Sequence, residues 1–277
     1  MTPAPEDDRR KSGVPIIIRN VSKAFGEDGD TPFLALKNLD VSIPAGQFIS
    51  VVGASGCGKS TLMLMIAGLL KRTTGEITVD GRTVTRPITD VGIAFQDHLL
   101  LEFRTAFENV MLHAVIRGLD RNMLARRAKD LFAQLKLEHA MDKYPRQLSG
   151  GMRQRVSLIR TLVHEPSLIL MDEPFGALDA LTRLQVRTDL ENLWMRRRPT
   201  VVFITHSVEE AVGLSDRILV MSPSPGEVID EVHVDLPRPR PIVLGDAPEF
   251  GAYVDRIHRQ FERMGILHSV TPQPAVA

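Results

Sequence analysis

Nine residues, GASGCGKST from Gly53 to Thr61, constrain the fold of this chain more than any other stretch. They follow an apolar run rich in β-branched residues at 48–52 and precede a helical pattern that begins at Ser60. Their glycines match the pattern G-x-x-x-x-G-K-[ST], in which the backbone turns tightly and points its N–H groups at phosphate oxygens. The stretch therefore predicts a phosphate-binding loop in an α/β fold. The alternative is a glycine-rich strand-to-helix turn that binds nothing.

The side chains of this loop have separate expected roles. Lys59 adds a positive charge for the β- and γ-phosphates, and the Ser60 hydroxyl is a ligand for the accompanying Mg²⁺. The helix start contributes free N–H groups and its positive dipole end, and Thr61 is placed to touch the α-phosphate. The predicted nucleotide contacts are Gly53, Ala54, Ser55, Gly56, Cys57, Gly58, Lys59, Ser60 and Thr61.

The stretch from Leu168 to Glu173 predicts a buried strand that ends in two adjacent acids. Burying carboxylates is costly unless a cation or a water-bearing site receives them. We expect Asp172 to hold Mg²⁺, through water, and Glu173 to polarise the water that attacks the γ-phosphate. A solvated strand edge or a helix cap is the alternative, and the upstream phosphate-binding loop favours the nucleotide site.

LSGGMRQR, from Leu148 to Arg155, predicts a second anion-binding helix start. Ser149 is placed as an N-cap, while Gly150 and Gly151 let the backbone approach an anion closely. One nucleotide needs only one phosphate-binding loop, so we expect this second start to serve the nucleotide of another subunit. An ordinary capped helix with a glycine-rich entry is the alternative.

Composition narrows the class of protein and its compartment. Lys plus Arg and Asp plus Glu both number 34, so no basic field predicts a nucleic-acid partner. The longest apolar runs, such as 48–52, are strand-sized and far shorter than the roughly 20 residues that span a bilayer. The single cysteine, Cys57, excludes an internal disulfide, and residues 1–11 lack an apolar signal core, which predicts a reducing, cytosolic compartment. A helix N-terminus lowers a thiol pKa, so Cys57 is expected to be a reactive group that ATP protects, although not a catalyst.

GASGCGKST, LSGGMRQR and LILMDEPFGALD together resemble the ATP-binding subunit of ABC transporters, over about residues 16 to 235. The resemblance implies that Gln96 joins the two lobes and reaches Mg²⁺ and water, and that Asp179 crosses to the partner subunit. It also implies that His206 is the switch histidine at the γ-phosphate. Phe25 falls where the family stacks an aromatic ring on adenine, and a core position is its alternative.

The roles implied for the site can be grouped by chemistry. The catalytic residues are Glu173, His206 and Gln96, and the metal ligands are Ser60, Gln96 and Asp172. Beyond the loop, the nucleotide contacts are Phe25, Ser149, Gly150, Gly151 and Asp179. The cofactors are ATP and Mg²⁺.

The expected fold class is α/β: a P-loop NTPase core with a parallel sheet, an antiparallel β subdomain and an inserted helical lobe at about 97–165. Residues 1–14 are polar and predict a disordered leader, followed by the ATPase domain at 15–245. A C-terminal helix and tail occupy 246–277, with Asp246 as the cap of an apolar stripe. Strands are expected at 16–21, 36–43, 48–52, 76–79, 168–171, 201–205 and 217–221.

The family resemblance also implies partners. Two copies would sandwich two ATP molecules and drive integral membrane permease subunits from the cytoplasmic face of the membrane. FGALDALTR, MSPSPGEV and DLPRPR resemble bacterial importers of nitrate, sulfonates and taurine, which also use a periplasmic binding protein. Where that group usually has Leu-Leu-Pro-Trp after the glutamine loop, this chain has Leu-Leu-Glu-Phe at 100–103.

The competing interpretation is a soluble ABC ATPase that acts on ribosomes or in DNA repair, because it shares every catalytic residue. Three features of the chain disfavour it: a single cassette, no room for a coiled-coil insertion between Lys59 and Ser149, and no basic stripe.

Overall fold

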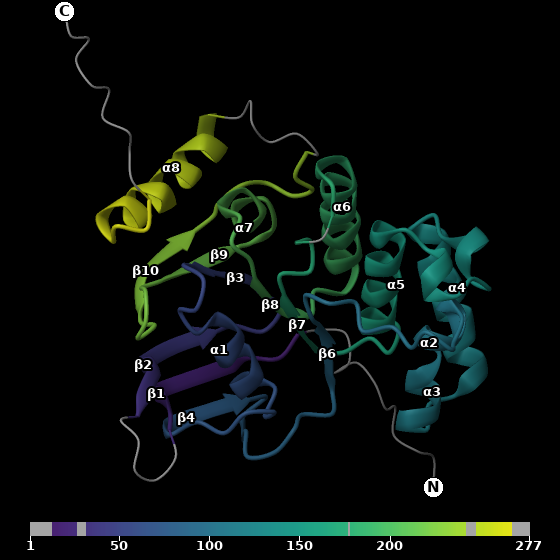
Figure 1. Ribbon diagram of the computed structural model, residues 1–277, viewed down its shortest axis with the longest axis horizontal. Helices are drawn as coiled ribbons and strands as arrows, with labels where there is room; N and C mark the ends of the chain where they lie inside the picture. Colours follow the sequence, from purple (N-terminus) through teal and green to yellow (C-terminus); the bar gives the residue numbers. More distant parts are fainter. Residues whose placement is uncertain (1–12, 27–31, 177, 242–247, 268–277) are drawn as a thin grey trace, which may run out of the picture.

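The structure is a computed structural model of the 277-residue chain, and it describes residues 13–26, 32–176, 178–241 and 248–267. Figure 1 shows two sheets, helices around the larger sheet and a group of helices to one side of it. The leader expected at 1–14 lies almost wholly outside the described residues, and so does the expected cap Asp246. Among the described helices, none is both long and apolar enough to cross a membrane.

The smaller sheet is antiparallel and has the order β2-β1-β4-β5. Its strands are β1 (Ile16–Phe25), β2 (Phe33–Ile43), β4 (Thr74–Val79) and β5 (Arg82–Thr83). Along β2 the side chains of Leu39, Val41 and Ile43 are buried, while those of Asp40 and Ser42 are exposed. This alternation is typical of a sheet with one face on the core and the other in water.

The larger sheet has the order β10-β9-β3-β8-β7-β6, and all neighbouring strands run parallel except β9 and β10. Its strands are β3 (Phe48–Gly53), β6 (Val91–Ala94), β7 (Leu168–Asp172), β8 (Thr200–Ile204), β9 (Arg217–Met221) and β10 (Val228–His233). Every residue of β3, β8 and β9 is buried, as expected for parallel strands covered on both faces. The ends of β3, β7 and β8 therefore meet at one edge of the sheet, where ligands bind in open α/β folds.

Four helices pack around this sheet: α1 (Lys59–Ile66), α6 (Ala180–Arg197), α7 (Val208–Leu214) and α8 (Pro248–Arg263). The apolar stripe expected near the C-terminus lies on α8, where Phe250, Ile257 and Phe261 are buried. These three side chains share a hydrophobic cluster with α7 and with β9 and β10. These buried side chains therefore hold α8 against α7 and the β9–β10 side of the larger sheet (Figure 1).

The helices at the side of the sheet have a hydrophobic cluster of their own. They are α2 (Ala106–Val110), α3 (Leu112–Arg117), α4 (Arg121–Gln134) and α5 (Gly150–Leu162), with short 3₁₀ turns at Glu138–Ala140 and Pro145–Gln147. Thr105 and Glu108 form a capping box at α2, and Asp120 caps α4. The predicted α/β class, with parallel strands, an antiparallel sheet and a helical group, is confirmed.

Candidate functional site

The loop between β3 and α1 is a tight cradle. Gly56 and Gly58 have φ angles of 76° and 96°, in the left-handed region that favours glycine. A Cβ on Gly58 would lie 2.5 Å from Cδ2 of the fully buried Leu36. The Lys59 side chain is buried, and its Nζ donates to the carbonyl oxygens of Gly53 and Ala54, at 2.9 Å each. The loop is therefore packed against β2 and braced by its own lysine.

Cys57 corrects one expectation from the sequence. Its side chain is 1% exposed, and burial raises the pKa of the thiol, more than the Lys59 ammonium lowers it. The prediction that the helix N-terminus lowers the pKa of Cys57 is therefore wrong. It failed because the local sequence does not show that the Cys57 side chain faces the core. A thiol of this kind is mostly protonated at neutral pH.

The two acids follow β7 at the edge of the sheet that also carries the loop. Burial raises the pKa of Asp172, and a hydrogen bond from the Ser60 side chain opposes that shift. Glu173 has a φ of 45°, and its N–H donates to the Ile204 carbonyl of β8 at 2.9 Å. The Oε2 of Glu173 lies 3.2 Å from Nδ1 of His206. Tertiary structure thus brings together Ser60, both acids and the histidine, from three separate segments.

The chemistry of this donor set fits Mg²⁺. Asp172 and Ser60 offer hard oxygen ligands, and a cation beside the half-buried Asp172 carboxyl would offset its desolvation. Within the described residues no group of three or more His, Cys, Asp or Glu side chains could hold a metal. A site with one or two protein ligands, completed by phosphate oxygens and water, is the usual arrangement for Mg²⁺.

Two further predicted residues lie at the margins of the site. Gln96, two residues beyond β6, is exposed, and its Nε2 lies 3.9 Å from the position of a Cβ on Gly176, shortly after Glu173. Phe25 ends β1 and is 40% exposed, and the ammonium of Lys23 lies 4.6 Å from its ring centroid. Phe25 is therefore not a core side chain, and its stacking on adenine stays a prediction.

The second predicted anion site lies at the start of α5. Ser149 is its N-cap and accepts from the N–H of Met152 at 3.3 Å. A surface cavity of about 340 Å³ opens beside Ser149 and Gly150 and extends to Asp179, with no residue of the phosphate-binding loop in its lining. Asp179 caps α6 by accepting from the N–H of Thr182 at 3.0 Å. A hydrogen bond with the Thr182 side chain, followed by this backbone bond, lowers the pKa of Asp179. The α5 start and Asp179 therefore line one surface hollow, which is separate from the phosphate-binding loop of the same chain.

The family follows from comparison with known proteins. A family model described as ABC transporter matches residues 36–176, about half of the chain, including the loop, both acids and the α5 start. The chain belongs to the ABC transporter family. It is an ATPase subunit of this family, as the resemblance in its motifs implied.

Named relatives of this ABC subunit support the assignment over a greater length. The aliphatic sulfonates import ATP-binding protein of Bacillus cereus is 37% identical over 254 residues, which are 92% of this chain and 98% of the relative. The bicarbonate transport ATP-binding protein of Synechococcus elongatus is 43% identical over 228 residues, 81% of this chain and 34% of that longer protein. A solved dimeric ATP-binding cassette, bound to ADP and Pi after hydrolysis, has a TM-score of 0.70 at 32% identity and covers 79% of this chain and 98% of its own.

Sequence reasoning missed three residues, Thr205, Ser207 and Glu210, that hold the histidine loop of this ABC subunit, the turn around His206 between β8 and α7. The Thr205 hydroxyl donates to Oε2 of the buried Glu210 at 2.6 Å and accepts from the N–H of Ser207 at 3.0 Å. Ser207 in turn caps α7 by accepting from the N–H of Glu210. The signal was available, because Ser-x-x-Glu before an apolar run is a capping pattern that fixes where a helix begins.

Proposed function

We propose that this ABC subunit hydrolyses ATP to power the import of a small anion, such as nitrate, a sulfonate or taurine, through a membrane permease. The relatives named above support this substrate class, since aliphatic sulfonates and bicarbonate are both small anions. The motifs at 175–183, 221–228 and 235–240 support the same importer group. A soluble ABC ATPase of the ribosome or repair type is not favoured, because the matched relatives are named for import and transport.

The proposed chemistry uses Glu173 as the general base. A carboxylate only accepts hydrogen bonds, so in the pair with Oε2 of Glu173 it is Nδ1 of His206 that carries the proton. This contact, with the backbone bond from Glu173 to Ile204, holds the carboxylate in one orientation. The carboxylate then takes a proton from the attacking water. Lys59, Gln96 and His206 are proposed to bind the γ-phosphate. Asp172 and Ser60 would hold Mg²⁺, and the ion would supply positive charge to offset that of the phosphates.

The observation that carries the proposal of a dimer is the surface hollow at the start of α5. Ser149 and Gly150 are exposed there, and no side chain of the chain's own phosphate-binding loop lines it. A helix N-terminus with glycines favours an anion, so we propose that the hollow covers the ATP of a second copy. ATP then joins the two copies, and hydrolysis removes the bridge, which is a ligand-driven shift between two states. The solved relative named above is also dimeric.

The permease is proposed to contact the helical group, between about 97 and 165. Large apolar side chains are exposed there: Phe103 at 73%, and Val115 and Ile116 at 76% each. Large apolar side chains exposed to this degree favour an interaction surface if they form one patch. We therefore propose a peripheral location on the cytoplasmic face of the membrane, with a periplasmic or surface binding protein delivering the anion. Glu102 and Phe103 would tune this contact, because they replace the usual Pro-Trp of the group.

The test is to recover the complex in its ATP-bound state. The Glu173→Gln variant is purified with Mg-ATP from detergent-solubilised membranes of its host, and its companions are identified by mass spectrometry. A Lys59→Ala variant, deficient in nucleotide binding, is the matched control. Recovery of a multi-helix permease, enriched by Glu173→Gln over the control, supports the proposal. Recovery of ribosomes or repair proteins, or of no membrane protein, contradicts it.

A further inference from the structure

A cavity of about 490 Å³ lies between α4 and α6, at the opposite edge of the sheet from the nucleotide site. Its floor includes Ile169 and Val201, near the beginnings of β7 and β8, whereas Asp172 and His206 follow the ends of those strands. The three residue steps of β7 from Ile169 to Asp172 span about 10 Å, so the cavity and the acids lie towards opposite ends of the strand. It belongs to neither of the two anion-binding helix starts.

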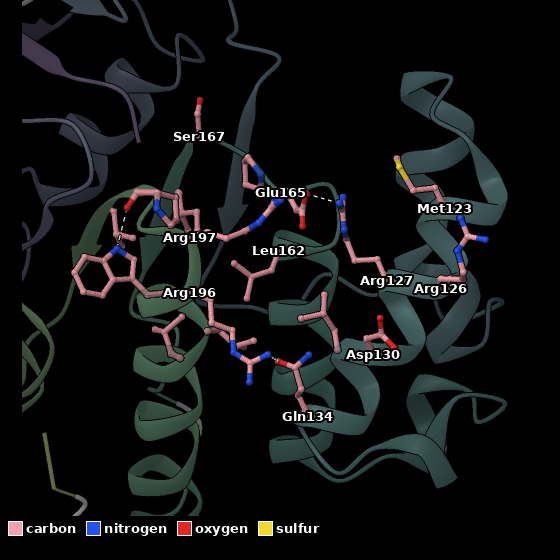
Figure 2. A pocket seen from close by; sticks show the side chains of 18 residues that line it. Met123, Arg126, Arg127, Asp130, Gln134, Leu162, Glu165, Ser167, Arg196 and Arg197 are labelled. Atoms are coloured by element: carbon pink, nitrogen blue, oxygen red, sulfur yellow. Dashed lines mark hydrogen bonds and ion pairs between the residues drawn. The ribbon is translucent and has the colours of Figure 1, made fainter. Parts of the chain in front are cut away.

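The middle of the cavity is apolar. Trp194 and Leu190 of α6 and Leu131 of α4 are buried, and Leu162 lies between the two helices in Figure 2. The volume is within the usual 300–1,000 Å³ range of small-molecule sites, which are mostly apolar with a few placed polar groups. The shape and lining therefore favour a ligand with an apolar body.

Two polar bridges cross the cavity from α6 towards α4 (Figure 2). In the first, Glu165 forms ion pairs with both Arg127 of α4 and Arg197 of α6. In the second, Arg196 of α6 donates to Oε1 of Gln134 on α4, at 2.8 Å. The first bridge sets one carboxylate between two guanidinium groups, whereas the second pairs a guanidinium with a neutral amide.

The charges of the lining indicate an anionic head group. The described residues of the lining include four guanidinium groups, from Arg126, Arg127, Arg196 and Arg197, and two carboxylates, from Asp130 and Glu165, so positive groups outnumber negative ones by two among them. A carboxylate or sulfonate would be a stronger acceptor for Arg196 than the Gln134 amide, because charge-assisted hydrogen bonds are about twice as strong as neutral ones. If the ligand replaced the Gln134 amide as the acceptor for Arg196, its anionic head group would lie at the second bridge. Its apolar body would then extend towards Trp194.

We propose that this cavity binds a small amphipathic anion, with its carboxylate or sulfonate head on Arg196 and its apolar body between α4 and α6. The site contacts both the helical group, through α4, and the sheet layer, through α6. It is independent of the transported anion and of ATP. Such a ligand would hold the two parts of the subunit together from the side away from the nucleotide.

Trp194 makes the test direct, since it is the only tryptophan of the chain and lines the cavity. The probe is 10-bromodecanoate, whose bromine quenches indole fluorescence on contact, added to the full chain. We expect saturable quenching that decanoate reverses and that 1-decanol reverses at least tenfold more weakly. Arg196→Gln should weaken the affinity at least tenfold, about 1.4 kcal/mol. Arg121→Gln, on the same α4 but outside the lining, should leave it unchanged.

Several outcomes would overturn the proposal. Quenching without saturation, or equal affinity in wild type and Arg196→Gln, excludes the head-group contact. Loss of binding in Lys59→Ala would move the probe to the phosphate-binding loop, and loss in Val115→Ser/Ile116→Ser would move it to the exposed apolar surface. Because Arg196 is exposed and lies at a helix end, Arg196→Gln is expected to stay folded, and its thermal unfolding is measured beside the binding. Filling the cavity with Leu193→Phe should also reduce binding.

Discussion

The two glycine-rich helix starts of this subunit differ in how far the chain itself completes them. The start of α1 is packed: Gly58 touches the buried Leu36, and Lys59 bonds to the loop's own carbonyl groups. The start of α5 is open: Ser149 and Gly150 are exposed, and a Cβ on Gly150 would meet nothing within 4 Å. The α1 start is therefore packed by residues of its own chain, whereas the α5 start is exposed to solvent.

This difference teaches why similar local sequences predict different partners. Both starts combine glycine with the positive end of a helix, so both favour an anion. Packing decides whether that anion lies inside the fold of one chain or between chains. The predictions below test this contrast, from the largest expected effect to the smallest.

The largest expected effect concerns the chemistry on the α1 side. Glu173→Gln should lower ATP turnover by about 10²- to 10⁴-fold, the usual contribution of a general base. Binding at both helix starts should persist, so an ATP-dependent dimer should accumulate. Steady-state phosphate release and size-exclusion chromatography with ATP check both parts. Glu209→Gln, an exposed acid on α7, is the control, and normal turnover in Glu173→Gln would reject the assignment of the base.

The same substitution at the two starts should have unequal effects on stability. Gly58→Ala combines a positive φ with a clash against Leu36, so it should lower the free energy of unfolding by about 2–4 kcal/mol. Gly150→Ala has open space and ordinary helix geometry, and its change should stay within about 0.5 kcal/mol. Urea denaturation of both variants measures the difference. Equal losses would show that the α5 start is packed as tightly as the α1 start.

A charge at the open start should affect association rather than folding. Ser149→Arg should leave nucleotide binding by one copy within about twofold and weaken the ATP-dependent dimer of the Glu173→Gln background at least tenfold, about 1.4 kcal/mol. Ser149→Ala separates capping from docking, since loss of the cap costs about 1 kcal/mol of stability. Analytical ultracentrifugation and nucleotide titration provide the two readouts. Loss of nucleotide binding within the monomer would refute the composite site.

The smallest expected effect concerns the rate at which the buried Cys57 thiol is alkylated. Because burial raises the pKa of Cys57, its thiolate is scarce at pH 7, and the rate of alkylation should rise as pH increases beyond the range of ordinary cysteines. At pH 7 the rate with iodoacetamide should be roughly tenfold or more below that of a free cysteine. Mass spectrometry of the folded and urea-unfolded protein measures it. A folded-state rate equal to the unfolded one would mean that the loop opens freely.

Particular residues show where sequence patterns sufficed for the fold and where they did not. The strands predicted at 168–171 and 217–221 are apolar runs between turns, and the structure has them as β7 and β9. β6 was missed because four residues are too short to show a period, and β10 because its polar residues lie at an edge of the sheet. β10 is a strand because it pairs with β9. A local sequence pattern does not contain that pairing.

The candidate site divides in the same way. Local motifs predicted Ser60, Asp172 and Glu173, because phosphate chemistry demands particular residue types at helix starts and strand ends. His206 was predicted only through the family resemblance. Only the tertiary structure could show the 3.2 Å contact between Glu173 and His206, or that Thr205 and Glu210 brace the histidine loop.

The sequence by itself determined the class of fold and the family, and it predicted the phosphate-binding residues, since these depend on local motifs in a required order. Tertiary structure alone decided that Cys57 is buried, that the start of α5 faces outwards, and that arginines of α4 and α6 border one cavity. The physical reason is that burial, pKa and charge balance arise from residues distant in the chain, which no local pattern brings together.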